Sequence, residues 1–446
     1  MTAISLARIG PRTRRRAGEL PIEYNLLLTA TLCLLAFGAV MVFSASSTAA
    51  LLGESGDSAY YLKRTLLVAA AGIVVMRLLS LRGARLVRPL TPLLVAGSFV
   101  LLIAVMLPGV GAAANGAQRW IVVGPLQVQP SELAKLALVV YGAQLLAGRP
   151  RTVKTIRTTV PHLAVVGLGC LLMVAEPDLG TAIVVCLATA ALLLCAGMKL
   201  RHLLLLAAAL GAVLLCAIVV EPYRMQRLTG FLDPSGDPDG VGFQAIQAKI
   251  ALGSGGIFGV GLGQSLQKAF YLPEAHTDMI AAVIGEELGL IGISVLLGLY
   301  GLFGYAGLRT AQRARDRYGK LLAAGLTSLV LIQAIVNLFA VLGLAPLTGV
   351  PLPFVSYGNS SLMVMLTATG LILNVARRGY AVAPGRRDSG AARLQVVDGG
   401  RAVRGDAGKT AARGRSVSGR AKSRHRRGGN SRARRAGAGR RRRASG

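Results

Sequence analysis

The stretch from Gly253 to Gly292 reads GSGGIFGVGLGQSLQKAFYLPEAHTDMIAAVIGEELGLIG. It begins with closely spaced glycines, continues as a polar loop, and ends in an apolar segment that keeps two adjacent carboxylates. Most of the chain around it is apolar enough to span a membrane. In such a chain a long polar segment is where chemistry can meet water, and its ionisable groups are candidate functional groups. Asp278 is the carboxylate that we expect to be catalytic.

The composition is that of a membrane protein. The 446 residues are 53% hydrophobic and 15% charged, with a mean hydropathy of +0.57, which lies outside the range of soluble globular chains. Runs of about 18 or more apolar residues recur, and each is long enough to cross a bilayer as a helix. The first run, 25–44, is longer than the apolar core of a signal peptide and lacks a clear cleavage site. We therefore interpret it as a retained membrane span.

We predict an all-α polytopic membrane protein with about ten transmembrane helices and a large extracytoplasmic loop between spans seven and eight. The predicted spans lie at 25–45, 62–81, 89–107, 131–148, 160–176, 180–198, 203–221, 278–308, 321–344 and 361–376. They form one transmembrane domain, 25–376. A basic cytoplasmic N-terminal segment, 1–24, precedes it, and a basic disordered cytoplasmic tail, 377–446, follows it.

The loops between the predicted spans differ in charge. One set is basic and contains Arg82, Arg85 and Arg88, then Arg149, Arg151, Lys154 and Arg157, then Lys199 and Arg201, then Arg309, Arg313, Arg315, Arg317 and Lys320. The positive-inside rule places this set and both termini in the cytoplasm. The opposite face receives 46–61, 108–130, 176–180, 222–277 and 345–360. Because this face holds the unusual polar residues, we expect the substrate outside the cytoplasm.

The 222–277 segment is expected to contain ordered structure. Phe243, Ile246 and Ile250 fall on one helical face, which predicts a short amphipathic helix on or in the membrane. The glycines that follow allow tight, irregular backbone. Non-helical backbone at membrane depth is tolerated only where protein or water covers it, so a re-entrant element that lines a cavity fits this pattern.

The net charge of +31 is concentrated near the C-terminus, where 22 Lys and Arg residues stand against 3 Asp residues in 377–446, a net charge of +19. A disordered tail near anionic lipid is the first interpretation. DNA binding ranks lower because no fold or aromatic platform accompanies the charge, and an acidic protein partner is the third interpretation. The cysteines lie in apolar runs and predict buried small side chains without a disulfide. They are Cys33, Cys170, Cys186, Cys195 and Cys216.

Asp278 follows Pro273, Glu274, His276 and Thr277 just before a predicted span. Thr277 or Asp278 could cap that helix, which is a common structural role. Alternatively, burial at a membrane-facing cavity would raise the pKa of Asp278, which suits a general base that takes a proton from a sugar hydroxyl. The local motif leaves both roles open.

Glu286 and Glu287 lie roughly 12 Å further along the same helix. A charge near the centre of a membrane helix costs around 2.5–3.5 kcal/mol, so such groups are usually paired or line a polar cavity. A structural salt bridge with Lys135 is our first expectation. A proton or ion relay is the alternative.

Two further motifs lie on the outer face, each just before a predicted span. Asp178, in the acidic turn that starts at Glu176, could cap the next helix, shape the same cavity as Asp278, or hold a cation there, although a metal site needs more ligands. Arg119 and Trp120 come before a block in which Ser131 is a candidate N-cap. Trp120 is interpreted as an interface anchor, with stacking on a sugar ring as the alternative.

The remaining outer-face candidates are hydroxyls and cations. Ser356, Ser360 and Ser361 belong to a proline-bounded loop before the last predicted span, where hydroxyls can receive an anion or a sugar or simply cap the helix. Outer-face cations run against the positive-inside bias and predict a pyrophosphate or anionic headgroup as partner, with snorkelling to lipid as the alternative. They are Arg224, Arg227, Lys249 and Lys268, beside Arg119 and the Lys63–Arg64 pair.

These motifs, in this order and on this face, resemble those of the SEDS family (shape, elongation, division and sporulation), whose members include FtsW, RodA and SpoVE. The resemblance covers roughly residues 22–378. Its specific blocks are Arg119-Trp120 with Gln129–Glu132, Glu176–Thr181, Gly253–Gly292 and Pro353–Ser361. The sequence YLPEAHTD at 271–278 is similar to the FtsW branch more than to the RodA branch. Gly358-Asn359 departs from the Gly-Gly that relatives carry before Ser-Ser.

The resemblance implies a peptidoglycan glycosyltransferase that polymerises lipid II at the outer face of the bacterial cytoplasmic membrane, with septal wall synthesis in cell division as its role. It implies that Asp278 is the catalytic acid and that undecaprenyl pyrophosphate is released. The expected substrate-binding residues are Arg119, Trp120, Asp178, Arg224, Lys249, Lys268, His276, Ser356, Ser360 and Ser361. No nucleotide-binding fingerprint is present, and a divalent cation, Mg or Mn, is left open with its ligands unknown.

The resemblance also implies partners and a location. The expected partners are a class B penicillin-binding protein, which is an FtsI-like transpeptidase, and other divisome proteins, with FtsZ as a candidate for the basic tail. No nucleic-acid partner is expected. The expected location is the inner membrane at the division septum, with both termini cytoplasmic.

Three alternatives to this function stay open. One is a lipid II flippase that uses Glu286 and Glu287 as a relay, although the polar motifs gather on one face. Another is the elongation polymerase of the RodA type. The last is a scaffold without chemistry that recruits partners through its tail.

Overall fold

The computed structural model describes residues 20–52, 56–114, 117–124, 126–148, 156–220, 222–237, 240, 242–268 and 272–380. They belong to the first of two compact units, Met1–Gly385. The predicted tail after 380 and most of the N-terminal basic segment lie outside the described residues. The four cysteines with described side chains are free thiols, but the prediction that they are buried is wrong: Cys33 and Cys195 are exposed, and Cys170 and Cys186 are half-buried.

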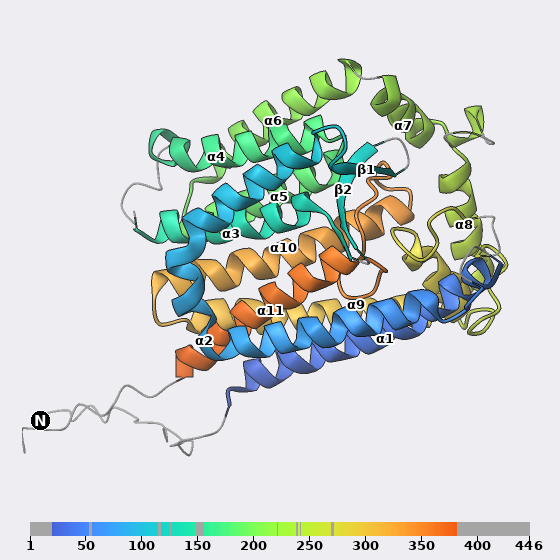
Figure 1. The fold of residues 1–446 in the computed structure, drawn as a ribbon, viewed down its shortest axis with the longest axis horizontal. Helices are drawn as coiled ribbons and strands as arrows, with labels where there is room; N and C mark the ends of the chain where they lie inside the picture. The colour runs from blue at the N-terminus through green and yellow to red at the C-terminus, as the bar shows by residue number, and fades with distance from the viewer. Residues whose placement is uncertain are drawn as a thin grey trace, which may run out of the picture. The chain divides into compact units, whose positions relative to one another are not determined.

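The described unit is mainly helical (Figure 1). Its long helices are α1 (Ile22–Leu52), α2 (Tyr60–Val105), α3 (Pro130–Gly148), α4 (Ile156–Ala175), α5 (Leu179–Ala196), α6 (Leu200–Val220), α9 (Ile280–Arg313), α10 (Arg317–Val341) and α11 (Asn359–Tyr380). Shorter helices between α6 and α9 are α7 (Pro222–Leu232), the 3₁₀ turn η1 (Pro234–Gly236) and α8 (Phe243–Gly255). Every one of the ten predicted spans overlaps a helix.

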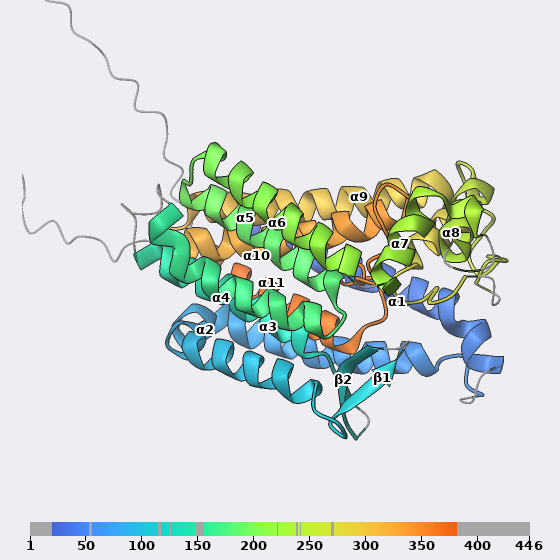
Figure 2. The same ribbon diagram turned by 90° about the horizontal axis from the view of Figure 1, so that it is seen from above.

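Seven stretches among the described residues are long and apolar enough to cross a membrane. They are Ile22–Leu51, Tyr60–Gly83, Arg85–Val105, Leu179–Ala196, Ile280–Arg313, Arg317–Val341 and Asn359–Gly379, and shorter apolar stretches lie in α4 and α6. Two of the seven are halves of α2. Figures 1 and 2 show that the chain reverses its direction at a bend between these two halves.

A three-stranded sheet corrects the all-α prediction. Strands β1 (Gly111–Ala114), β2 (Ala117–Val123) and β3 (Leu126–Val128) pair antiparallel in the order β1-β2-β3. The Trp-Ile-Val-Val run at the end of β2 is rich in aromatic and β-branched residues, which fit an extended strand. Gly124, with φ of 59°, lies in the two-residue turn to β3, where a positive φ is required. The sheet holds Arg119 and Trp120 on β2.

The core lies along α9, α10 and α11, which are apolar on most faces. α10 packs against α9, α5 and α3, while α11 packs against α2, and α1 packs against α9. Phe303 on α9 and Leu322 on α10 are fully buried, as are Leu366 and Ile372 on α11. A helix that is apolar all round is buried by protein or lipid. Other parts of the protein bury most of α10 and α11, whereas α9 keeps an exposed apolar face that includes Leu290 and Val295.

The predicted amphipathic helix forms as α8, but its buried face differs from the expected one. Ile250 is exposed, whereas Ala248, Ala251 and Gly255 are buried in the contact with α9. A Cβ atom on Gly255 would lie 1.9 Å from the carbonyl oxygen of Gly285, so only glycine allows this approach. Small residues allow close backbone packing, and this packing overrides the burial of the larger side chains.

The Gly-rich stretch after α8 pairs with a break in α9. Gly289 has φ of 62° and ψ of −157°, which interrupts the helix. The amides of Leu290 and Ile291 donate to the carbonyls of Gly256 and Ile257, and the amides of Val260 and Gly261 donate to those of Glu286 and Glu287. The segment 256–261 therefore supplies the hydrogen bonds that the broken helix lacks. This satisfies the requirement for covered backbone at membrane depth.

Replacing Gly289 with alanine is expected to destabilise the protein. A Cβ atom there would lie 2.4 Å from the Gly259 nitrogen and 2.6 Å from the Ile257 oxygen, at a backbone angle that only glycine adopts readily. Strain and overpacking together predict a loss of roughly 2–5 kcal/mol in unfolding free energy. Thermal unfolding in detergent measures this change.

Gly298→Ala is the matched control, because it lies on the same helix and a Cβ atom there meets nothing within 4 Å. Its unfolding temperature should equal or slightly exceed that of the parent, since alanine favours the helix by roughly 0.5–1 kcal/mol. Equal stability of the Gly289→Ala and Gly298→Ala variants would contradict the break and its pairing.

Candidate active site

A cavity of about 730 Å³ opens where the starts of α2 and α11 meet β2, β3, the turn before α9 and the loop 345–358. Of the predicted site residues, the ones that line it are Arg119, Trp120, His276, Asp278 and Ser361. They come from segments up to 242 positions apart in the sequence, between 119 and 361. The structure thus brings four of the ten predicted substrate-binding residues and the predicted catalytic residue into one cavity.

Asp278 lies in the turn just before α9, with a half-buried side chain. The residue that caps α9 is Met279, and no side-chain hydrogen bond caps this helix. The carboxylate instead faces the cavity beside Gly349, where an added Cβ atom would lie 3.9 Å from Oδ2. The capping alternative for Thr277 and Asp278 is therefore wrong.

Asn337 fixes the backbone of this turn. This buried residue of α10 donates from Nδ2 to the Asp278 carbonyl at 2.7 Å and to the Val350 carbonyl at 2.8 Å. One side chain therefore holds the turn before α9 against the loop before α11. Sequence analysis missed Asn337, although an amide within an apolar helix is an available signal.

Burial, and after it the nearby Glu274 carboxylate, raise the pKa of Asp278 to about 6. The amide of Asp278, the Thr277 hydroxyl at 3.3 Å and the Arg227 guanidinium oppose this shift. A carboxylate with such a pKa is ionised at neutral pH and still basic enough to accept a proton. Glu274 itself is exposed and has a positive φ of 54°.

Aromatic rings line one wall of the cavity. His276 packs against Tyr61 and Tyr357, with ring centroids 4.4 and 5.6 Å away, and the two tyrosine rings contact each other at 4.9 Å. The Tyr357 amide donates to the His276 carbonyl at 2.9 Å, which ties the two loops together. Burial lowers the pKa of His276, which favours its neutral form. Tyr61 and Tyr357 were missed by sequence analysis because neither belongs to a charged or catalytic pattern.

Three arginines reach the cavity: Arg64, Arg119 and Arg227. Arg119 donates from Nε to the Glu176 carbonyl at 3.2 Å and from Nη2 to the Pro177 carbonyl. These bonds fix its guanidinium on the acidic turn that precedes α5. Burial and the Asp178 carboxylate raise the pKa of Glu176 to about 8, against the opposing effect of Arg119.

Three predicted substrate-binding residues are structural in this fold. Asp178 is buried and caps α5, accepting from the Thr181 amide at 3.2 Å and from Ser131 Oγ at 2.7 Å. The Ser356 hydroxyl accepts from the Leu352 amide at 2.8 Å. The Ser360 hydroxyl bridges the Gln129 amide and the Gln127 carbonyl, both at 3.0 Å. None of the three lines the cavity, because each side chain already satisfies nearby backbone.

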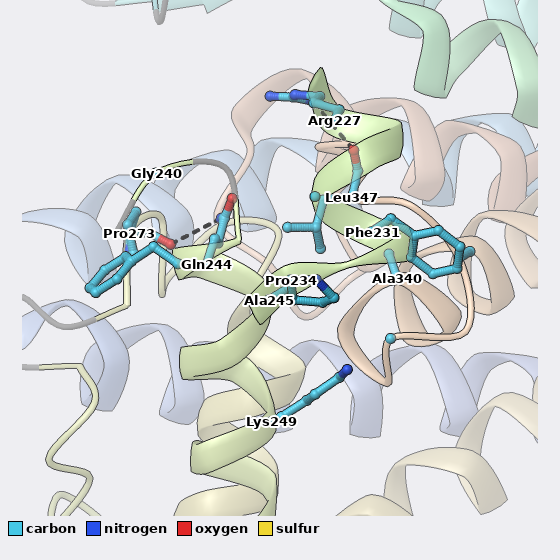
Figure 3. A pocket seen from close by; sticks show the side chains of 14 residues that line it. Arg227, Phe231, Pro234, Gly240, Gln244, Ala245, Lys249, Pro273, Ala340 and Leu347 are labelled. Carbon is cyan, nitrogen blue, oxygen red and sulfur yellow. Dashed lines mark hydrogen bonds between the residues drawn. The ribbon is translucent and has the colours of Figure 1, made fainter. Parts of the chain in front are cut away.

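Lys249 lies in a separate hollow of about 260 Å³ between α7, α8 and the end of α10 (Figure 3). Arg227 belongs to both hollows and donates to the Leu347 carbonyl at 3.3 Å. Gln244 donates to the Pro273 carbonyl at 3.3 Å and forms part of the shared wall. Lys249 is thus near the main cavity but does not line it. Arg224 lies in α7, and its side chain is outside the described part.

Lys268 is a correction to the substrate-binding prediction. It is buried and pairs with Glu287 at 2.9 Å, while Ser44 on α1 donates to the same carboxylate at 2.6 and 2.7 Å. Glu286 accepts from Ser265 Oγ at 2.5 Å and from the Leu266 amide at 3.0 Å. The expected salt bridge exists, but its cation is Lys268 rather than Lys135.

Lys135 belongs to a different buried pair. It binds Glu132 at 2.7 Å and the Gln333 side chain at 2.5 Å. Gln333 in turn donates to the Pro351 carbonyl at 2.9 Å and to Ser361 Oγ at 3.3 Å. This network holds two residues of the cavity wall in place, since Pro351 and Ser361 both line the cavity.

The acidic lining of the cavity consists of Glu274 and Asp278. Among the residues that the structure describes, no group of three or more His, Cys, Asp and Glu side chains could hold a metal ion. Mg²⁺ commonly binds through one or two carboxylates and completes its shell with water and substrate phosphates. The two carboxylates fit a cation of that kind, which would neutralise phosphate charge when bound.

The fold and site define a multi-pass membrane protein with a candidate active site for an anionic substrate. The family model described as a cell cycle protein, FtsW/RodA/SpoVE, matches residues 24–380. Stage V sporulation protein E of Bacillus subtilis is 41% identical over 353 residues, which cover 79% of this chain and 96% of the relative. A probable peptidoglycan glycosyltransferase FtsW of Trichlorobacter lovleyi is 40% identical over 364 residues, covering 81% and 95%.

Solved structures agree with this match. A chain of a peptidoglycan synthase complex that coordinates polymerization and crosslinking has a TM-score of 0.65 at 31% identity, covering 80% of this chain and 98% of that one. The rod shape determining protein RodA of Thermus thermophilus has a TM-score of 0.59 at 30% identity, covering 79% and 96%. The chain belongs to the FtsW/RodA/SpoVE family, the SEDS proteins.

Lys268→Met is expected to destabilise the protein, because it leaves Glu287 buried without its cation. Breaking a buried pair in this way costs about 3–5 kcal/mol. The double variant Lys268→Met with Glu287→Gln should recover part of this loss, because no unpaired charge remains. Thermal unfolding in detergent measures both.

Lys249→Met is the control, since Lys249 is exposed and its loss should leave the unfolding temperature unchanged. If Lys268→Met were as stable as Lys249→Met, the assignment of Lys268 to a structural pair would be wrong.

Proposed function

We propose that this protein polymerises lipid II into glycan strands at the outer face of the bacterial cytoplasmic membrane, with Asp278 as the general base. The chain is a peptidoglycan glycosyltransferase of the FtsW/RodA/SpoVE family. The observation that carries the role of Asp278 is its placement. Its carboxylate faces a cavity lined by three arginines instead of capping the helix that follows.

In the proposed reaction, Asp278 takes the proton from a hydroxyl of the acceptor sugar. The hydroxyl oxygen forms a bond to the anomeric carbon of the donor, and the bond from that carbon to the pyrophosphate oxygen breaks. Undecaprenyl pyrophosphate leaves with the bonding electrons. The proton that Asp278 holds then passes to solvent, which restores the carboxylate for the next cycle.

The basic residues suit the leaving group. Arginine forms paired, charge-assisted hydrogen bonds with phosphate, and fixed cations stabilise charge that develops in the transition state. Arg119 is held in place by two carbonyls, so it needs little reorganisation when the pyrophosphate charge appears. Trp120, Tyr61 and Tyr357 offer aromatic faces to the sugars, which favours the stacking interpretation of Trp120.

The cellular role that we propose is septal wall synthesis. Relatives named FtsW are 40–42% identical to the chain, whereas the RodA structure is 30% identical. With ten spans, the positive-inside rule favours both termini in the cytoplasm and the cavity on the outer face. A crosslinking transpeptidase of the class B penicillin-binding type is the proposed partner, since a structural relative belongs to a complex that polymerises and crosslinks.

The flippase alternative receives less support from the buried acids. Glu286 and Glu287 are held by Lys268, by the hydroxyls of Ser44 and Ser265 and by backbone amides. A relay needs a carboxylate that is free to exchange protons along a path. These carboxylates instead stabilise the contact between α1, α9 and the 260–268 segment.

Asp278→Asn should abolish glycan synthesis from lipid II by the purified protein with its partner, because the amide cannot accept the proton. The fall should reach at least 10²-fold, the lower end of general-base contributions. In the source bacterium, the same variant as the sole copy should give filaments that elongate without dividing. Gel analysis of glycan strands and microscopy measure the two outcomes.

Asp233→Asn is the matched control, because this exposed carboxylate caps η1 in the same inter-helix segment. It should leave synthesis intact. Normal strand synthesis by a folded Asp278→Asn protein would refute the base, whereas round cells instead of filaments would refute the septal role alone.

Glu274→Gln should move the acidic limb of the pH–rate profile to lower pH. Asp278 must be ionised to act, so activity falls as pH drops through its pKa of about 6. Removing the Glu274 charge lowers that pKa, and the base stays ionised to a lower pH. Initial rates between pH 4.5 and about 8 would measure the shift.

Asp57→Asn provides the comparison, because Asp57 pairs with Lys63 at 2.7 Å and does not perturb Asp278. Its profile should match that of the parent. If the acidic limb of the Glu274→Gln profile stayed in place or moved to higher pH, another group would control the pH dependence.

A further inference from the structure

Two adjoining hollows lie at the end of the helical bundle opposite the Asp278 cavity. One, of about 300 Å³, is lined by Arg85, Arg315 and Arg378, and the other, of about 240 Å³, by Arg82, Arg85, Arg377 and Arg378. Arg85 and Arg378 belong to both. We call these two hollows the arginine pockets. The cavity lies at the start of α11 and the arginine pockets lie at its end, roughly 33 Å away at 1.5 Å per residue.

The positive charge of the arginine pockets is largely uncompensated. Within the described part of the chain, Arg82, Arg85, Arg377 and Arg378 make no hydrogen bond, ion pair or ring contact. Arg315 donates only to the Gly379 carbonyl, at 3.3 Å. Asp316 is the one acidic residue in the lining, and it caps α10 through the Gly319 amide. Five guanidinium groups therefore meet one carboxylate that is already engaged.

The frame that holds these arginines is rigid. Arg82 and Arg85 lie at the bend of α2, and Arg377 and Arg378 in the last turn of α11. The buried Asn374 side chain donates to the Ser80 carbonyl at 2.9 Å and joins the two helices. A Cβ atom on Gly83 would lie 2.8 Å from Leu371, so the helices are in close contact.

The positive-inside rule explains why arginines occur at this end of the spans but not why they converge. Residues that only orient a helix can spread over its exposed faces. Here three segments far apart in the sequence direct their guanidinium groups into two hollows that share a wall. Leu81, which is 44% exposed, adds an apolar surface beside the charges.

We propose that the arginine pockets bind the two phosphates of diphosphatidylglycerol from the adjacent leaflet. Each pocket receives one phosphate, and the shared Arg85 and Arg378 lie between them. Guanidinium groups bind phosphate through paired hydrogen bonds. Basic pockets between membrane helices recognise anionic headgroups of this kind. The acyl chains lie along the exposed Leu81. This site is separate from the catalytic cavity and does not depend on the proposed reaction.

The experiment compares lipid retention by the full chain in detergent, measured by native mass spectrometry after exposure to diphosphatidylglycerol, phosphatidylglycerol or phosphatidylcholine. The parent should retain diphosphatidylglycerol preferentially. Arg85→Gln with Arg378→Gln should lower that retention about tenfold or more, because each charge-assisted contact contributes about 1.5–3 kcal/mol. Arg85→Lys with Arg378→Lys should recover part of it, since lysine keeps the charge without the paired geometry.

Arg201→Gln with Lys320→Gln is the control, because it removes two exposed cations, in the first turns of α6 and α10, that lie outside the arginine pockets. Its retention and unfolding temperature should equal those of the parent. If this control lost as much lipid retention as Arg85→Gln with Arg378→Gln, the effect would be one of net charge alone, and the proposal would be overturned. Competition by soluble pyrophosphate at the affinity of the lipid would also overturn it. Unchanged lipid retention with loss of a co-purifying protein would assign the arginines to a protein partner instead.

Discussion

The paired break between α9 and the 256–261 segment is the constraint on which the site depends. A chain at membrane depth must satisfy every backbone donor and acceptor internally. Here the amides of Leu290 and Ile291 and the carbonyls of Glu286 and Glu287 find partners in the Gly-rich turn. The chain can therefore leave α8 and run as an irregular segment over 256–261 whose backbone pairs with α9, and it is again irregular over 272–279 just before α9. That irregular path carries Asp278 to the cavity.

Side chains reinforce this path at both ends. Lys268, Glu287 and Ser44 fix the 260–268 segment against α1 and α9, while Asn337 fixes the Asp278 turn against α10. Between them, the contact of Tyr357 with His276 joins the loop before α11 to the same turn. A general base requires fixed geometry relative to its substrate. The supporting network supplies it from α1, α9, α10 and the loop before α11.

Much of this arrangement could be predicted from local pattern. Apolar runs placed the helices, and the polar order of the outer loops placed Asp278, Arg119 and Trp120 near one another. Contacts between distant segments could not be predicted, because local periodicity carries no information about which charge meets which. Lys268 was therefore assigned to substrate and Lys135 to the wrong acid, and Asp178 and Ser356 bind backbone instead. The sheet at 111–128 was hidden by its short strands, and the buried face of α8 was decided by close packing rather than by residue size.

Asp278, Glu286 and Glu287, three of the four carboxylates in the Gly253–Gly292 stretch, show how the environment of a carboxylate decides its role. Glu287 is neutralised by Lys268 and by the Ser44 hydroxyl, and Glu286 is held by a hydroxyl and an amide, so both are committed to the fold. Asp278 has one weak hydroxyl contact at 3.3 Å, a neighbouring negative charge and arginines across a cavity. Burial and the Glu274 charge raise its pKa, and no cation among the described residues pairs with it directly to hold that pKa low. A carboxylate that the fold leaves unpaired beside a basic cavity has its proton affinity available to a substrate, and this difference separates the candidate base from the two acids that stabilise the helix break.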